Sequence, residues 1–227
     1  MIKKVLVVGY LGNMGKRYCS ILNYLGVPWQ GIDRHNLKDK LDRDIGGILI
    51  ATPTSMHFEN IVRYSIYDLP ILCEKPITKS EQELETIGDL CANLSVLNQY
   101  AFMIGNESKG TTYVDYYNTG ADGLAWDCIN LVGLSTGDCY LRNVSPVWSI
   151  ILNGKPLNRS DVDVSYVDCI KHWLDVYPHD FNYIYYSHKR ILEYEKSQCC
   201  NRHTGKEIVI PAPRKDDKAL IWKCDDD

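Results

Sequence analysis

A glutamate, a lysine and a proline follow one another where an apolar run ends. Residues 69–73 read LPILC, and Glu74, Lys75 and Pro76 come directly after them. Such a run is typical of a buried strand, and the carboxyl ends of parallel strands gather functional groups. A lysine ammonium there can hydrogen-bond a developing alkoxide and help to move a proton. The alternative is a Glu74–Lys75 pair that only caps the strand.

A second pattern lies near the N-terminus, where three glycines are spaced G-x-x-G-x-x-G, one residue longer than the usual dinucleotide fingerprint. Glycine lets a strand-to-helix turn be tight and lets backbone N–H groups approach a pyrophosphate at the helix N-terminus. Glycine is also common in turns that bind nothing. The residues expected to contact a dinucleotide here are Gly9, Tyr10, Leu11, Gly12, Asn13, Met14 and Gly15.

Asp33 lies 18 residues past Gly15, at the expected end of the second strand. A carboxylate there accepts hydrogen bonds from the ribose hydroxyls of the adenosine. The neighbouring Arg34 would instead suit a 2′-phosphate. Because Asp33 would repel that phosphate, the sequence favours NAD over NADP as the cofactor. The alternative for Asp33 is a surface aspartate that closes the strand.

Strands and helices alternate over the first hundred residues. Strands are expected within residues 3–8, 27–33, 46–54, 69–76 and 95–103, and helices within residues 16–25, 56–67 and 78–94. The last helix begins with a capping box of Ser80 and Glu83. This alternation predicts an α/β fold, a Rossmann-type parallel sheet with helices on both faces.

After residue 98 the sequence becomes aromatic and rich in turns. One clear helix is expected at 160–176 and one strand-like run at 207–213. Residues 113–118 and 181–188 carry aromatics that read as core or cross-strand pairs, or as the lining of a ligand site. We therefore predict a Rossmann domain at 1–98, then a smaller α+β domain at 99–227 for substrate and oligomerisation. It ends in an extended C-terminal arm.

Composition excludes several classes of function. The formal charge of −4 gives no sign of a basic surface for nucleic acid, and no apolar run reaches the length of a membrane span. No C-x-x-C pair occurs among the nine cysteines, so no metal site is expected. We expect a cytoplasmic protein whose cysteines are mostly buried reduced thiols, namely Cys19, Cys73, Cys91, Cys128 and Cys169.

The glycine turn, ATPTSMH at 51–57 and CEKP at 73–76, in this order, resemble the nucleotide-binding half of the Gfo/Idh/MocA family (glucose–fructose oxidoreductase and inositol dehydrogenase). The resemblance covers residues 3 to about 100. It implies a Rossmann domain, an α+β substrate domain, and NAD or NADP used on a carbinol carbon of a sugar, cyclitol or related small molecule. It also implies a homo-oligomer. Since only about 130 residues follow residue 98, the chain resembles a short variant with a reduced second domain.

The resemblance also implies roles for single residues. Lys75 matches the lysine that hydrogen-bonds the reacting substrate oxygen, and Pro76 orients it. His57 is less specific, because a histidine in the first turn of a helix can be solvated or can bond a neighbouring carbonyl. The further residues expected along the cofactor are Ala51, Thr52, Pro53, Thr54, His57, Glu74, Lys75 and Pro76.

The second half departs from the family's G-G-x-x-x-D-x-G-x-H motif. In GADGLAWDCINLVG, Gly123 and Asp127 are in register, but Ile129 and Leu131 stand where glycine and the catalytic histidine are expected. We predict Asp127 as the second catalytic residue. Asp168 and His172 mimic the aspartate–histidine spacing, but they lie too late in the chain and fit a packed helix better.

The sequence thus predicts an NAD(P)-dependent oxidoreductase acting on a small sugar, polyol or related substrate. Two alternatives stay open because the histidine is missing. One is a regulatory or scaffold protein that binds the dinucleotide without catalysis. The other is a reductase of a conjugated substrate that takes its proton from solvent.

Overall fold

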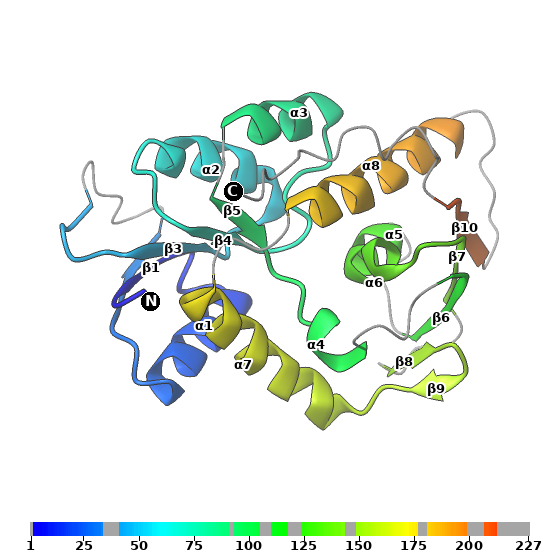
Figure 1. The fold of residues 1–227 in the computed structure, drawn as a ribbon, viewed down its shortest axis with the longest axis horizontal. Helices are drawn as coiled ribbons and strands as arrows, with labels where there is room; N and C mark the ends of the chain where they lie inside the picture. Colours follow the sequence, from blue (N-terminus) through cyan, green and yellow to red (C-terminus); the bar gives the residue numbers. More distant parts are fainter. Residues whose placement is uncertain are drawn as a thin grey trace, which may run out of the picture. The chain divides into compact units, whose positions relative to one another are not determined.

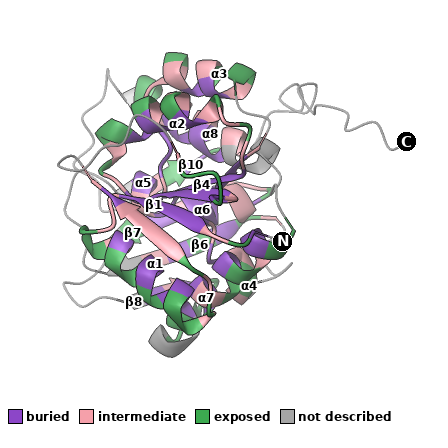
Figure 2. Cartoon of the chain, turned by 90° about the vertical axis from the view of Figure 1, so that its left-hand side faces the viewer, coloured by how far each residue is buried: buried purple, intermediate pink, exposed green. Residues whose placement is uncertain are grey.

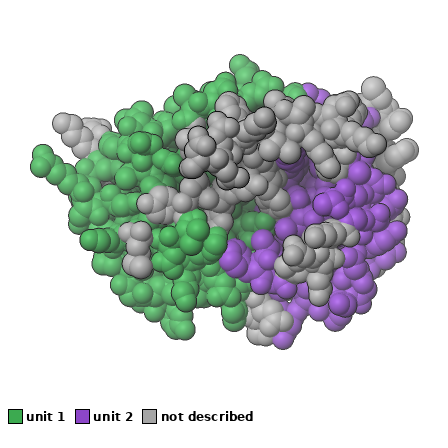
Figure 3. Space-filling view, in the orientation of Figure 1, with its two compact units in different colours: residues 1–99, 163–181 green, residues 100–162, 182–227 purple. Residues whose placement is uncertain are grey.

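A computed structural model describes residues 2–33, 41–90, 93–104, 110–117, 124–143, 149–176, 181–198 and 207–212. The chain divides into two compact units, coloured separately in Figure 3. The first contains Met1–Gln99 and Asp163–Phe181, and the second contains Tyr100–Val162 and Asn182–Asp227. Each unit holds a five-stranded sheet. The functional division into residues 1–98 and 99–227 stays a prediction.

The first unit contains the parallel sheet that the sequence predicts. Its strands run in the order β2-β1-β3-β4-β5, and each neighbouring pair is parallel. All residues of β1, β3, β4 and β5 are buried, as expected for strands covered on both faces. The strands are β1 (Val5–Val8), β2 (Trp29–Ile32), β3 (Gly47–Ile50), β4 (Ile71–Cys73) and β5 (Leu94–Val96).

Helices cover both faces of this sheet. Figure 1 shows α2 and α3 on one face, and α1 and α7 on the other. In Figure 2 the buried colour lies on the central strands and on parts of these helices, whereas the edge strand β2 is mostly intermediate. The predicted α/β fold class is therefore confirmed. The helices are α1 (Asn13–Tyr24), the short 3-10 helix η1 (Thr54–Met56), α2 (His57–Ser65), α3 (Glu81–Leu90) and α7 (Arg159–Asp175).

The capping box at the start of α3 forms only in part. The Glu83 backbone N–H donates to Ser80 Oγ at 3.4 Å, as predicted. The Glu83 carboxylate, however, accepts the hydroxyl proton of Thr78, and the Ser80 backbone N–H donates to Thr78 Oγ1 at 2.9 Å. Thr78 therefore takes over the second half of the cap.

Helix α7 forms where the sequence predicts a helix, but it belongs to the first compact unit. Its Trp173 is fully buried beside Gly47, and the Ile2 backbone N–H donates to the Leu174 carbonyl at 3.0 Å. Most of this helix, from residue 163 on, thus clusters with the first unit although it follows residue 98 in the chain. Its apolar face is needed to cover the parallel sheet.

The second unit contains a mixed sheet of order β10-β7-β6-β8-β9, in which only β6 and β7 are parallel neighbours. One face carries the buried side chains Val114, Leu141, Ile150 and Ile210. The strands are β6 (Thr112–Tyr117), β7 (Cys139–Asn143), β8 (Ser149–Leu152), β9 (Lys155–Pro156) and β10 (Glu207–Ile210). The helices are α4 (Ala101–Ile104), α5 (Leu124–Asp127), α6 (Ile129–Leu134) and α8 (Phe181–Gln198).

The two aromatic segments of this half form different structures. Tyr113 on β6 stacks on Tyr140 of β7 with ring centroids 4.9 Å apart, a cross-strand pair of the predicted kind. Residues 181–188 instead begin α8, so their reading as strand-like pairs was wrong. The buried residues of α8 include His188, Ile191 and Leu192, which follow a helical period.

Four of the five cysteines predicted to be buried thiols, Cys19, Cys73, Cys128 and Cys169, are buried, and Cys91 lies outside the described residues. Burial raises the pKa of Cys169 to about 12, so this thiol stays protonated at neutral pH.

The side chain of Arg190 holds several parts of the second unit together. It lies on α8 and is 6% exposed. Its guanidinium donates to the carbonyls of Val132, Ser135, Gly137 and Pro211 at 2.7 to 2.9 Å. Three of these carbonyls lie at or just after the end of α6, and the fourth directly follows β10. A buried carbonyl oxygen without a hydrogen-bond donor costs free energy, so Arg190 stabilises the second unit.

We expect Arg190→Met to lower the free energy of unfolding by about 2 to 4 kcal/mol, because buried carbonyls lose their donors. The matched control is Arg142→Met. Arg142 is half exposed and pairs with Asp115 at 2.7 Å, so its loss should cost less than about 1 kcal/mol. Urea unfolding measures the free energy of unfolding of both variants, and equal decreases would contradict the stabilising role of Arg190.

Candidate functional site

The glycine turn between β1 and α1 is built around close backbone contacts. Gly9 has φ +83°, and a Cβ there would lie 2.9 Å from the Ala51 carbonyl oxygen. A Cβ on Gly15 would overlap the Gly9 carbonyl oxygen. The Gly12 backbone N–H closes the turn on that oxygen at 3.0 Å. Glycine at positions 9 and 15 is therefore required by the fold itself.

The N-terminus of α1 is suited to an anion. Gly12 is its N-cap, makes no side-chain cap hydrogen bond, and is followed by no acidic residue in the first turn. The amide groups of that turn and the positive end of the helix dipole therefore have no competing carboxylate from the same turn. A phosphate group fits such a position.

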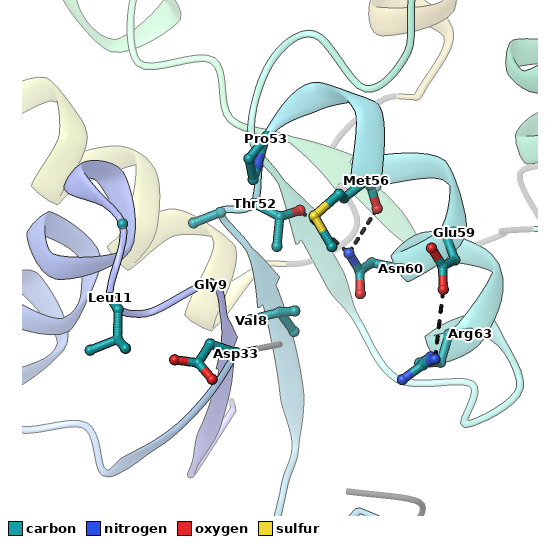
Figure 4. A pocket seen from close by; sticks show the side chains of 12 residues that line it. Val8, Gly9, Leu11, Asp33, Thr52, Pro53, Met56, Glu59, Asn60 and Arg63 are labelled. Atoms are coloured by element: carbon teal, nitrogen blue, oxygen red, sulfur yellow. Dashed lines mark hydrogen bonds and ion pairs between the residues drawn. The ribbon is translucent and has the colours of Figure 1, made fainter. Parts of the chain in front are cut away.

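A cavity of about 420 Å³ lies beside this turn, where the strand order reverses between β1 and β3. Ligands of open α/β sheets bind at this switch point, outside the carboxyl ends of the strands. Asp33 lines the cavity at the end of β2, and Figure 4 shows its carboxylate on the side opposite α2. The predicted cofactor residues that line it are Gly9, Leu11, Gly12, Asp33, Ala51, Thr52 and Pro53.

Helix α2 supplies a wall that the sequence analysis missed. Asn60 Nδ2 donates to the Met56 carbonyl at 2.7 Å and to Thr52 Oγ1 at 3.4 Å. Arg63 and Glu59 form an ion pair at 3.7 Å along the helix (Figure 4). Met56, Asn60 and Arg63 are spaced i, i+4 and i+7, so helical periodicity after the ATPT segment was the available signal.

Other predicted cofactor residues do not line this cavity. The ring of Tyr10 packs over Gly31 and lies 6.2 Å from that of Trp29. Asn13 and Met14 begin α1, and Thr54 begins η1. Arg34 lies outside the described residues, so Arg63 is the cation that the described part of the chain places at this cavity.

The Glu74–Lys75–Pro76 segment follows β4, which lies next to β3. Lys75 is half-buried, and the peptide bond to Pro76 is cis. Glu74 is 8% exposed; its carboxylate accepts the hydroxyl proton of Tyr18 and the Lys75 backbone N–H, the latter at 2.8 Å. Burial and the Glu74 carboxylate raise the pKa of Tyr18 well above its ordinary value. Glu74 therefore ties the end of β4 to α1.

His57, the first residue of α2, is 1% exposed and does not line the cavity. Its Nδ1 lies 2.8 Å from the Pro76 carbonyl oxygen, and its Nε2 lies 2.7 Å from the Thr52 carbonyl oxygen. The alternative that His57 bonds a neighbouring carbonyl is thus confirmed. Burial lowers the pKa of His57, although both carbonyls and the Glu74 carboxylate act in the opposite direction.

The second unit holds the other predicted catalytic residue. Asp127 is the half-buried last residue of α5, whereas Gly123 lies outside the described residues. Leu131, at the position where histidine is expected, is 1% exposed in the apolar core of this unit. On α7, Asp168 is exposed and His172 is half-buried. A catalytic role for Asp127 stays a prediction.

The described residues offer neither a metal site nor a membrane-spanning helix. No group of three or more His, Cys, Asp or Glu side chains among them is arranged to hold a metal ion. None of the helices they form has the length and apolarity needed to cross a membrane.

Comparison with known proteins matches part of the chain to a family model. Residues 23–102 match the family model GFO_IDH_MocA, described as an oxidoreductase family with an NAD-binding Rossmann fold. Among curated proteins, no sequence matches this chain.

Several solved structures share the fold. A myo-inositol dehydrogenase from Corynebacterium glutamicum aligns over 94% of this chain and 100% of its own, at 12% identity and a TM-score of 0.62. A putative myo-inositol dehydrogenase from Sinorhizobium meliloti aligns over 91% of this chain and 99% of its own, at 13% identity and a TM-score of 0.65. The WlbA (WbpB) dehydrogenase from Thermus thermophilus, solved with NAD and UDP-GlcNAcA, aligns over 82% of this chain and 92% of its own, at 12% identity and a TM-score of 0.60. At these identities the likeness is one of fold.

The Tyr18–Glu74 contact gives a test of the packing behind Lys75. We expect Tyr18→Phe to lower the free energy of unfolding by about 1 to 3 kcal/mol, because a buried carboxylate loses a hydrogen-bond donor. Tyr24→Phe on the same helix is the control; Tyr24 is 78% exposed, so its change should stay within about 0.5 kcal/mol. Chemical denaturation distinguishes the two, and a neutral Tyr18→Phe would show that Glu74 does not need this donor.

Proposed function

We propose that this chain is a member of the Gfo/Idh/MocA family, whose model matches residues 23–102, and that it interconverts a carbinol and a carbonyl in a small sugar, polyol or related molecule. The observation that carries the proposal is the cavity at the switch point of the parallel sheet, bounded by the glycine turn, Asp33 and the loop after β3. Lys75 follows the next strand along the same edge of the sheet.

The residues around the cavity fit a dinucleotide. The first turn of α1 would hold the pyrophosphate through backbone N–H groups, because no side chain caps it. Asp33 would accept hydrogen bonds from the adenosine ribose hydroxyls. Thr52 and Pro53 would line the path from the ribose toward Lys75. When bound, the nicotinamide supplies the site that accepts or gives the hydride.

Lys75 is the residue proposed to act on the substrate. Its ammonium would hydrogen-bond the substrate oxygen, which becomes more negative as the carbinol is oxidised or the carbonyl is reduced. The Glu74 carboxylate accepts hydrogen bonds from the Lys75 backbone N–H and from the Tyr18 hydroxyl, so the backbone that carries the ammonium is tied to α1. That anchoring favours a fixed direction for the side chain.

The partner in proton transfer is proposed to be Asp127 or bound water, because Leu131 replaces the family's histidine and is buried in apolar surroundings. Solvent protonation is the route by which a conjugated substrate would be reduced. A dinucleotide-binding protein without catalysis remains the contrasting case, and the Lys75 variant described below separates it from an enzyme.

The preference for NAD over NADP is proposed from Asp33. Its carboxylate lines the cavity and would repel a 2′-phosphate. The Arg63 guanidinium would attract a 2′-phosphate, but it already forms an ion pair with the Glu59 carboxylate at 3.7 Å. We also propose a cytoplasmic homo-oligomer. Tyr113 and Val209 lie on one face of the second sheet and are 53% and 39% exposed, so a second copy of the chain could bury apolar surface there.

The first test is thermal unfolding with NAD, NADH, NADP and NADPH, each added separately. A nucleotide at about a hundred times its dissociation constant adds roughly 2.7 kcal/mol to the free energy of unfolding. We expect the NAD pair to raise the melting temperature more than the NADP pair, and no shift with any of the four would overturn the proposal.

A variant of the turn makes that test specific. Gly12, the N-cap of α1, has φ −69°, which alanine accepts, and a Cβ there would lie 3.3 Å from the Gly9 carbonyl oxygen, a tight contact that a shift of a few tenths of an ångström relieves. We expect Gly12→Ala to fold but to bind the nucleotide at least about tenfold more weakly, because the methyl group occupies phosphate space. Gly46→Ala, whose Cβ would meet nothing closer than 3.5 Å, should keep both properties. Equal nucleotide shifts in the two variants would contradict a phosphate site.

Replacement of the lysine tests the chemistry. We expect Lys75→Met to lower kcat by about two to four orders of magnitude, the usual worth of a group that moves or stabilises a proton, with little change in nucleotide affinity. Lys79→Met, an exposed lysine four residues on, should leave both unchanged. Turnover is measured as the change in NADH absorbance with a panel of candidate substrates that includes myo-inositol and UDP-GlcNAcA. Undiminished turnover in Lys75→Met would remove the residue from the mechanism.

A further inference from the structure

The imidazole of His57 joins the ends of two neighbouring strands. Thr52 follows β3 and Pro76 follows β4, and the carbonyl oxygens of these two residues lie 2.7 and 2.8 Å from the two ring nitrogens. Thr52 lines the cavity, and Pro76 follows Lys75 directly in the chain. The ring therefore links the cofactor side of the site with the proposed catalytic lysine.

A neutral His57 ring can make only one of the two contacts as a hydrogen bond. Carbonyl oxygens only accept, and a neutral imidazole has one N–H to donate. Burial lowers the pKa of His57, which favours the neutral ring. Glu74 is the charged group that acts on His57, and its pull toward protonation is weaker than the effect of burial. One carbonyl must then go without this donor.

The surroundings decide which carbonyl keeps the donor. The contact with Pro76 is buried, whereas the contact with Thr52 is only partly buried. Water can reach the Thr52 oxygen and replace the ring as its donor, but a buried carbonyl without a donor costs more free energy. The proton therefore belongs on Nδ1, toward Pro76.

We propose that His57 is a positioning residue, whose Nδ1–H donates to the Pro76 carbonyl and so holds Lys75 in place at the end of β4. This inference rests on the proposed function, since it concerns the residue expected to contact the substrate. Asn60, one turn further along α2, bonds the Thr52 hydroxyl at 3.4 Å, so the same helix holds both strand ends. Loss of the Nδ1 bond should release the Lys75–Pro76 segment.

Two substitutions separate the two ring nitrogens. The amide nitrogen of asparagine takes the place of Nδ1, and that of glutamine reaches the place of Nε2. His57→Asn should therefore keep the bond to Pro76, while His57→Gln should keep only the contact with Thr52. A role in packing alone would affect both variants alike.

The measurement is the rate at which the Lys75 amine reacts with 2,4,6-trinitrobenzenesulfonate, located by peptide mass spectrometry in the full chain without nucleotide. We expect His57→Gln to react about three to ten times faster than the unchanged protein, the factor that one lost hydrogen bond represents, and His57→Asn to stay within about twofold. Equal rates in the two variants, or the reverse order, would overturn the inference.

A second measurement applies even if both variants unfold. In the unchanged protein labelled with [¹⁵N]histidine, NMR at pH 7 should show His57 as the neutral tautomer protonated on Nδ1. A proton on Nε2 alone would overturn the inference, because Nδ1 would then have no hydrogen to donate to the Pro76 carbonyl. Neither measurement needs a bound nucleotide, so failure of the proposed function, seen as the absence of any nucleotide-induced melting shift, is distinguished from failure of the His57 bond.

Discussion

The close approach of the end of β1 to the end of β3 is the constraint on which the site depends. A Cβ at Gly9 would lie 2.9 Å from the Ala51 carbonyl, and one at Gly15 would overlap the Gly9 carbonyl. With no side chains between them, the turn can bring the α1 N-terminus to the sheet edge. The cavity then forms between this turn and α2, with Asp33 on its border.

Buried polar groups extend that arrangement to the next strand. The Glu74 carboxylate receives the Tyr18 hydroxyl from α1, and the His57 ring on α2 faces the Thr52 and Pro76 carbonyls. Helices on opposite faces of the sheet thus hold the same strand ends. Each of these groups is expensive to bury without its partner, so the backbone around Lys75 has few alternative positions.

In the second unit a buried guanidinium, that of Arg190, also joins separate elements through hydrogen bonds, but its role is structural. Arg190 donates to carbonyls at the end of α6 and directly after β10, and it connects them to α8. Leu131, at the position where the resemblance led us to expect a histidine, belongs to the apolar core of this unit. Helix α6, which carries Leu131, contributes buried side chains to that core.

The sequence by itself determined the parallel sheet, the glycine turn, Asp33 and the lysine after β4, because strand and helix periods and turn residues are local signals. It did not reveal that α7 covers the first sheet, that residues 181–188 are helical, or that α2 forms a cavity wall. Those features depend on which apolar and polar faces meet after folding. The Tyr18–Glu74 contact joins residues 56 positions apart, and the His57–Pro76 contact joins residues 19 apart. No local pattern encodes such distant pairings, so only the tertiary structure decided them.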